Sequence, residues 1–86
     1  MFYVYTLQSK KDNQLYIGCT NDLKKRLLKH NTGQSVSTAH RIPLSLIYYE
    51  AYINKEDAFA REQYLKTGWG RVYIRKTLRR FLSLKT

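Results

Sequence analysis

The stretch DNQLYIGCTNDLKKRLLKHN, residues 12–31, opens with strand-forming residues and closes with a basic segment of helical period. Residues 14–19, QLYIGC, include the aromatic Tyr16 and the β-branched Ile17 and predict a strand. Asn21 or Asp22 can cap a helix that then runs to about Asn31. The stretch therefore predicts a strand followed almost at once by a basic helix.

This helix has one face that can pack against a sheet. Gly33 is suited to end it. At about 100° per residue, Leu23 and Leu27 define the buried stripe, and Arg26 and His30 lie at its edge. These two side chains can therefore reach the sheet, whereas the outward-pointing residues are Lys24, Lys25 and Lys29.

Upstream, residues 2–9, FYVYTLQS, predict another strand, and KKDN supplies a turn between the two. A turn centred between Lys10 and Lys11, or one residue later, pairs the strands in an antiparallel hairpin. Either register puts Tyr5 and Tyr16 on the same face, because cross-strand partners share a face.

Downstream, GQSVSTAHRIP at 33–43 has no clear period and reads as a loop, and LSLIYYEAYI at 44–53 predicts the third strand. Asn54 caps a further helix. Gly68 and Gly70 interrupt that helix before it resumes with an apolar face of Ile74, Leu78, Phe81 and Leu82. The order ββαβαα predicts an α+β fold, a small three-stranded antiparallel sheet flanked by three helices.

An acidic side chain falls on the apolar seam of the helix after Asn54. Ala58, Leu65 and Trp69 align on one side of this helix, and Glu62 falls between them. Burying an unpaired carboxylate costs several kcal/mol, so we expect it to pair with a cation such as Arg26 or to bind a metal.

Length and charge restrict the class of protein. At 86 residues, we expect one domain spanning 1–86. Sixteen Lys and Arg against six Asp and Glu give a net charge of +10, which favours a polyanionic partner. Nucleic acid is the leading candidate; association with the ribosome or with an acidic membrane surface is the alternative.

The single cysteine, Cys19, excludes an internal disulfide. The sequence has no secretory apolar segment and no apolar run of about 18 residues. We therefore expect a cytoplasmic protein without a membrane partner, and an organelle stroma stays open.

Each candidate residue also has an ordinary structural interpretation. Arg26 would be a half-solvated helix arginine, and His30 a surface or capping histidine. Tyr5 and Tyr16 would be two of eight tyrosines in a sheet-forming chain. Glu62 would be one half of an ion pair.

The segments together resemble the GIY-YIG nuclease family. YVY at residues 3–5 stands at the first signature triplet, and YIG at 16–18 matches the second. NDLKKRLLKHNTG at 21–33 is similar to the helix that carries the family arginine, and Glu62 in AFAREQYLK matches the metal-binding glutamate. The similarity covers nearly the whole chain and is greatest to small stand-alone members related to the nuclease domain of the bacterial excision-repair incision subunit.

The resemblance implies metal-dependent hydrolysis of phosphodiester bonds in nucleic acid, with DNA expected ahead of RNA. Glu62 would hold one Mg²⁺ or Mn²⁺, and Arg26 would contact the phosphoryl oxygens. Tyr5 is favoured over Tyr16 as the general base, with reversed roles left open. His30 would position phosphate or relay a proton. The expected contacts to the nucleic-acid backbone are Lys24, Lys25, Lys29, Arg75, Arg79 and Arg80.

The chain also departs from the family pattern. Gly18 corresponds to the signature glycine, but Tyr3 replaces the glycine of the first triplet, and Cys19 stands where several members carry a lysine. No residue matches the asparagine that some members place after the glutamate. Two alternatives therefore stay open, a nucleic-acid-binding module of the same fold with little activity and a basic protein on ribosomal RNA. Targeting through a protein partner or a homodimer also stays open.

Overall fold

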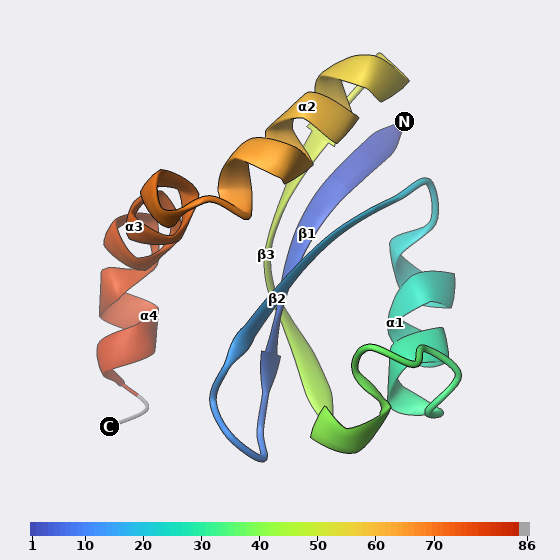
Figure 1. Ribbon diagram of the computed structural model, residues 1–86, viewed down its shortest axis with the longest axis vertical. Helices are drawn as coiled ribbons and strands as arrows, with labels where there is room; N and C mark the ends of the chain where they lie inside the picture. Colours follow the sequence, from blue (N-terminus) through green and yellow to red (C-terminus); the bar gives the residue numbers. More distant parts are fainter. Residues whose placement is uncertain (85–86) are drawn as a thin grey trace.

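The computed structural model describes residues 1–84, which form a sheet of three strands with helices on both sides (Figure 1). The elements in chain order are β1 (Phe2–Ser9), β2 (Leu15–Thr20), α1 (Leu23–Asn31), a 3₁₀ turn η1 (Ala39–Arg41), β3 (Leu44–Tyr52), α2 (Lys55–Leu65), α3 (Gly68–Thr77) and α4 (Arg79–Ser83). The predicted α+β class and the antiparallel sheet are confirmed. None of the helices in residues 1–84 is long and apolar enough to cross a bilayer.

The strands lie in the order β2-β1-β3, so β2 is an edge strand. In the hairpin Tyr5 pairs with Gly18, and Leu7 pairs with Tyr16. The turn is therefore centred one residue after Lys10–Lys11, and the prediction that Tyr5 and Tyr16 share a face is confirmed. Asn13 follows the turn with a φ of 61°, a conformation that asparagine tolerates better than most residues.

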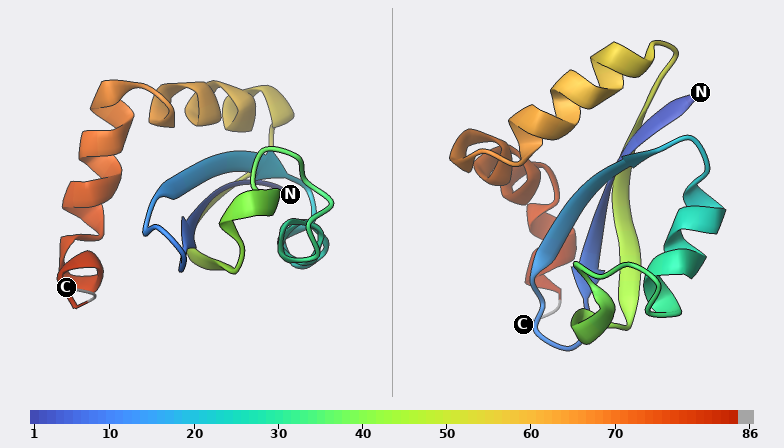
Figure 2. Two further views of the ribbon diagram at one scale, coloured as in Figure 1. Left: turned by 60° about the horizontal axis from the view of Figure 1, so that its bottom comes forward. Right: turned by 45° about the vertical axis from the view of Figure 1, so that its right-hand side comes forward.

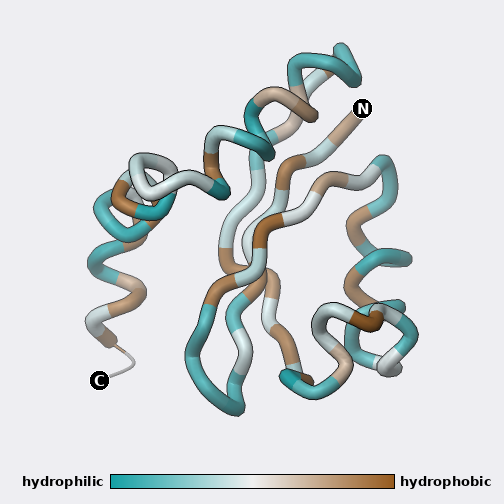
Figure 3. The backbone as a smooth tube through the Cα atoms, viewed as in Figure 1, coloured by the Kyte–Doolittle hydropathy of each residue, from teal (hydrophilic) through white to brown (hydrophobic). Residues whose placement is uncertain are grey.

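The two faces of the sheet carry different helices. Figure 2 shows α1 and η1 on one face and α2 on the other, with α3 and α4 continuing from α2 past one side of the sheet. Tyr5 and Leu7 belong to the apolar cluster under α1, whereas Val4 packs with Ala58 and Leu65 of α2. Figure 3 shows hydrophobic positions along the strands and a hydrophilic β1–β2 turn.

Side-chain caps fix the starts of both principal helices. The Asp22 side chain accepts a hydrogen bond from the Lys25 amide, and the Asn54 side chain accepts one from the Asp57 amide. Gly33 follows α1 with a φ of 77°. These helix boundaries agree with those predicted from the sequence.

The predicted break after α2 is wrong in detail. Thr67 caps α3, and its side chain accepts from the amide of Gly70, so both glycines lie inside the first turn of α3 rather than between two helices. Because α2 ends at Leu65, the seam does not continue, and Trp69 is 78% exposed.

A second interruption divides the last predicted helix at Leu78 into α3 and α4. The interruption changes the helical phase. Ile74 is buried and Leu78 and Leu82 are half-buried as predicted, but Phe81 is exposed.

The face of β3 toward α2 carries a charged network. Glu50 accepts hydrogen bonds from Arg61 Nε at 2.8 Å and Nη2 at 3.0 Å, and from the hydroxyls of Tyr48 and Tyr52, both at 2.6 Å. The Arg61 guanidinium also lies 4.7 Å from the ring centroid of Tyr73 on α3. The network therefore ties β3, α2 and α3 together.

Candidate active site

The centre of the site is a tyrosine that lies across a glycine. Tyr5 on β1 pairs with Gly18 on β2, and a Cβ added to Gly18 would collide with the Tyr5 phenol. Only glycine leaves room for the ring in this position. Tyr5 is 2% exposed, so the ring is held between the sheet and α1.

His30 holds the hydroxyl of this tyrosine. Its Nε2 lies 3.0 Å from the Tyr5 hydroxyl, and its Nδ1 lies 2.7 Å from Thr38 Oγ1. A neutral imidazole has one N–H donor and one acceptor nitrogen, so protons can be ordered along Thr38, His30 and Tyr5 in either direction. His30 is 0% exposed, which excludes the interpretation as a surface histidine.

Tyr16 and Arg26 lie around this pair. The Tyr16 ring centroid is 5.1 Å from that of His30 and 6.5 Å from that of Tyr5. Both Tyr16 and Arg26 are half-buried, and each lines a groove, so each retains access to solvent. The structure therefore brings together Tyr5, Tyr16, Arg26 and His30, the four candidates predicted for this face.

The two tyrosines differ in environment. Burial raises the pKa of Tyr5, the nearby Tyr16 raises it further, and the positive charge of Arg26 opposes both. Burial also lowers the pKa of His30, helped by the charges of Arg26 and Lys29, so the imidazole is neutral at physiological pH. The buried phenol–imidazole pair is thus uncharged.

Glu62 lies on the other side of β2. Its side chain is 12% exposed, and Oε2 lies 3.1 Å from Nζ of Lys66 one turn later on α2. The expected ion pair exists, but the cation is Lys66 rather than Arg26. The negative charge of Glu62 still raises the pKa of Tyr5, which places the two residues within electrostatic range.

Two grooves meet at the end of β2. Glu62 lines one of about 510 Å³ together with Cys19, and Arg26 lines one of about 230 Å³. Thr20 and Asn21 line both grooves. Arg26 and Glu62 therefore approach the same strand end from opposite faces of the sheet.

The donor set suits a metal that keeps most of its water. No group of three or more His, Cys, Asp or Glu side chains capable of holding a metal ion occurs within residues 1–84. Mg²⁺ binds through one or two carboxylates and retains several waters, so the groove lined by the carboxylates of Glu62 and Glu56 fits its needs. A metal that requires several protein ligands, such as structural Zn²⁺, does not fit.

The six lysines and arginines predicted to contact the nucleic-acid backbone are all exposed. Lys25 and Lys29 line the groove with Arg26, whereas Lys24 does not. Arg75 lines a separate groove with Tyr16, and Arg79 and Arg80 lie on α4.

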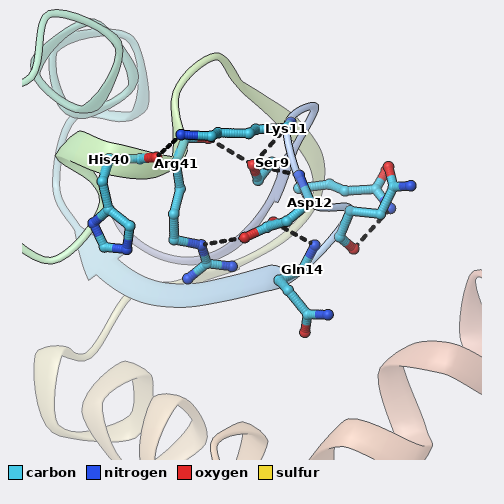
Figure 4. Close-up of polar contacts among 8 residues, drawn as sticks. Ser9, Lys11, Asp12, Gln14, His40 and Arg41 are labelled. Atoms are coloured by element: carbon cyan, nitrogen blue, oxygen red, sulfur yellow. Dashed lines mark hydrogen bonds and ion pairs between the residues drawn. The ribbon is translucent and has the colours of Figure 1, made fainter.

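The loop that showed no period in the sequence carries two residues missed by sequence reasoning. Thr38 holds the far side of His30, and Arg41 lines a groove with Tyr16. Figure 4 shows the Arg41 guanidinium directed at Asp12 of the β1–β2 turn, with Nε 3.5 Å from Asp12 Oδ2. Neither residue lies on a periodic segment, so no sequence signal identified either one.

The fold and these side chains define a class. Residues 1–73 match the model of the GIY-YIG catalytic domain, so the chain belongs to this family of nuclease domains. The expected family is thereby confirmed.

Two kinds of relative support the assignment. The UPF0213 protein SpyM50708 of Streptococcus pyogenes serotype M5 and the UPF0213 protein M28_Spy1146 of serotype M28 are each 46% identical over 65 residues, 74% of this chain and 70% of theirs. The solution NMR structure of the UPF0213 protein BH0048 from Bacillus halodurans is 33% identical, with a TM-score of 0.51, and the match covers 99% of this chain and 86% of that one.

Proposed function

We propose that this protein is a metal-dependent endonuclease that hydrolyses phosphodiester bonds, with DNA as the first substrate to test. The observation that carries the proposal is the packing of Tyr5, Tyr16 and His30 beside Arg26, with Glu62 close enough to act on Tyr5. Family membership supports a nucleic-acid substrate, and the net charge of +10 favours binding a polyanion.

The structure favours Tyr16 over Tyr5 as the residue that meets the attacking water. The sequence favours the opposite assignment, but Tyr5 is buried, its pKa is raised by burial, and its hydroxyl is engaged by His30. Tyr16 lines a groove and stays accessible. We therefore assign Tyr16 to orient the water and take its proton, and Tyr5 to position the site.

His30 has no access to a phosphate, since its side chain is fully buried. Of its two expected roles, the one compatible with burial is proton relay and orientation of Tyr5. Arg26 would contact the phosphoryl oxygens, which its planar guanidinium matches.

Glu62 would hold the Mg²⁺ or Mn²⁺, with waters and substrate oxygens completing its coordination. When bound, the ion would supply electrostatic stabilisation of the leaving oxygen. In the overall reaction the water oxygen bonds to phosphorus and the P–O3′ bond breaks, which leaves 5′-phosphate and 3′-hydroxyl ends as the family resemblance implies. In this step Tyr16 acts as the phenolate and takes one proton from the water, and the departing 3′ oxygen takes one from solvent.

The test is cleavage of supercoiled plasmid and of labelled branched and single-stranded oligonucleotides in Mg²⁺ or Mn²⁺. The wild type is compared with Glu62→Gln and with Asp57→Asn, which removes one negative charge from an exposed position on the same helix. We expect cutting by wild type and Asp57→Asn that chelator abolishes, and none by Glu62→Gln.

A second readout separates metal binding from turnover. Millimolar Mg²⁺ or Mn²⁺ is expected to raise the melting temperature of the wild type and of Asp57→Asn but not of Glu62→Gln, since an ion that binds only the folded chain stabilises it. If all three proteins bind the nucleic acid but none cleaves it, the result would instead support a nucleic-acid-binding module of the same fold with little activity. Equal cutting by wild type and Glu62→Gln would contradict the assigned role of Glu62.

A further inference from the structure

A third groove, of about 370 Å³, runs along the edge strand between β2 and the α2–α3 corner. Tyr16 and Ile17 of β2 line it on one side and Ile74 of α3 on the other. The charged residues that line it are all cations, namely Arg41, Lys66, Arg71 and Arg75. The groove therefore concentrates positive charge directly beside Tyr16.

Arg41 differs from the other three cations because it is held in place. Its side chain is 17% exposed, and its Nε and Nη2 atoms are buried without a hydrogen-bond partner. Nε lies 3.5 Å from Asp12 Oδ2, close enough for an ion pair but without a hydrogen bond. Buried donors without partners are rare in folded proteins, and the guanidinium fork matches the oxygens of a phosphate.

The position of Arg41 is fixed by the β1–β2 hairpin. Ser9 Oγ donates a 2.6 Å hydrogen bond to the Arg41 carbonyl, and Lys11 Nζ donates one of 3.2 Å to the carbonyl of His40 (Figure 4). The Lys10 amide donates to the carbonyl of Pro43 at 2.9 Å. The guanidinium is thus presented from a pinned backbone rather than from a free loop.

We propose that this groove is a second phosphate-binding subsite, in which Arg41 and Arg71 hold a backbone phosphate of the nucleic acid away from the scissile bond. The inference rests on the proposed function, since Tyr16 borders the groove and takes part in the proposed reaction. Arg26 would then contact the reacting phosphate, and the Arg41 groove would hold the strand on one side of it. The negative charge of Asp12 near the guanidinium weakens the positive potential of the groove, but its ion pair with Nε also helps to hold the Arg41 side chain in place.

The test is the affinity for a labelled DNA duplex measured by fluorescence anisotropy in EDTA, where no cleavage takes place. Arg41→Gln and Arg71→Gln are compared with Lys76→Gln, which removes the same charge from an exposed residue next to Arg75 that does not line the groove. We expect the dissociation constant to rise about tenfold for each groove variant and less than about twofold for Lys76→Gln. The slope of log K against log salt should fall by about 1 for the groove variants.

Two further measurements distinguish loss of the subsite from misfolding and from the loss of one positive charge alone. Arg41→Lys keeps the charge but loses the fork, and we expect it to recover only part of the affinity. In the wild type, the Nε–H proton resonance of Arg41 should shift on titration with the duplex, and this measurement requires no variant. Arg71 is exposed, so its variant tests the groove even if Arg41→Gln does not fold.

Equal weakening by all three glutamine variants would show that only net charge matters and would overturn the subsite. Unchanged affinity in both groove variants, with an unshifted Arg41 resonance, would also overturn it. Tight, groove-dependent binding by a wild type that does not cut would refute the nuclease but keep the subsite. If the wild type cleaves DNA but both groove variants bind it as tightly as the wild type, the nuclease would be supported and the subsite overturned.

Discussion

At the scale of single residues, the strongest constraint is the contact between Gly18 and Tyr5. A methyl group at position 18 would occupy the space of the Tyr5 phenol. We predict that Gly18→Ala displaces this ring, loosens its hydrogen bond to His30, and lowers the free energy of unfolding by about 1–3 kcal/mol, the usual cost of overpacking. Urea denaturation measures the loss, and plasmid cleavage should fall with it.

Gly68→Ala is the matched control, because a Cβ at that position meets no atom within 4 Å. It should leave stability and cleavage unchanged or slightly improved, since alanine is a better helix former than glycine. If both alanine variants behave alike, the close approach of Tyr5 to Gly18 is not a constraint on the protein.

The two tyrosines allow a second prediction. Tyr16→Phe should lower the cleavage rate by about 10²–10⁴-fold with little change in stability, as expected when a group that handles a proton in the reaction is removed. Tyr5→Phe should cost about 1–3 kcal/mol of stability, because the buried His30 nitrogen loses its partner, and should slow cleavage less. Single-turnover cleavage and urea denaturation of both variants provide the measurements. A rapid Tyr16→Phe enzyme beside a dead but stable Tyr5→Phe enzyme would restore Tyr5 as the base.

Sequence reasoning placed the two tyrosines on one face because strand pairing has a period of two. It did not find how deeply Tyr5 is buried. Tyr5 is buried because α1 packs over it. The His30 side chain that contacts Tyr5 is in turn held by Thr38, a residue of the loop without a hydrophobic period. Long-range packing of this kind leaves no local periodic signal.

At the scale of elements, the apolar seam of α2 ends at Leu65, whereas the sequence predicts that it continues to Trp69. We predict that Trp69→Gln changes the free energy of unfolding by less than about 0.5 kcal/mol, as for other exposed positions. Leu65→Ala should cost about 2–5 kcal/mol, because Leu65 is fully buried. Chemical denaturation of the two variants is the measurement, and a large loss in Trp69→Gln would support the continuous seam.

The boundaries of β1, β2, α1, β3 and the start of α2 follow from capping residues and hydrophobic period. The sequence predicts the break at Gly68 and Gly70 because glycine is a poor helix former, whereas the observed break lies between Leu65 and Gly68. Gly70 is instead needed for close packing, since a Cβ there would meet the backbone of Leu65. A glycine needed for close approach and a glycine that ends a helix have the same sequence signal.

At the scale of the whole molecule, acid stability depends on the network around Glu50. Burial alone would raise the pKa of Glu50, but the hydrogen bonds from Arg61, Tyr48 and Tyr52 outweigh it and lower the pKa to about 2. A folded-state pKa below the ordinary value of 4.5 stabilises the protein fully above pH 4.5. This contribution is lost as the pH falls from 4.5 toward 2.

We therefore predict that Glu50→Gln lowers the free energy of unfolding by about 1–3 kcal/mol at neutral pH. The variant should also lose less stability than the wild type between pH 5 and pH 2. Thermal unfolding across this range measures both effects, with Glu56→Gln as the exposed control. Parallel stability curves for wild type and Glu50→Gln would contradict the depressed pKa.

Arg26 and Glu62 reach the end of β2 from layers on opposite faces of the sheet (Figure 2). The proposed active site therefore forms only when both helical layers are packed on the sheet, since neither layer holds both groups. A nascent chain that has folded only through α1 has its basic helix and both tyrosines, yet it lacks the carboxylate of α2. On the proposed mechanism such a chain would lack the residue that holds the metal, so cleavage would require the complete fold.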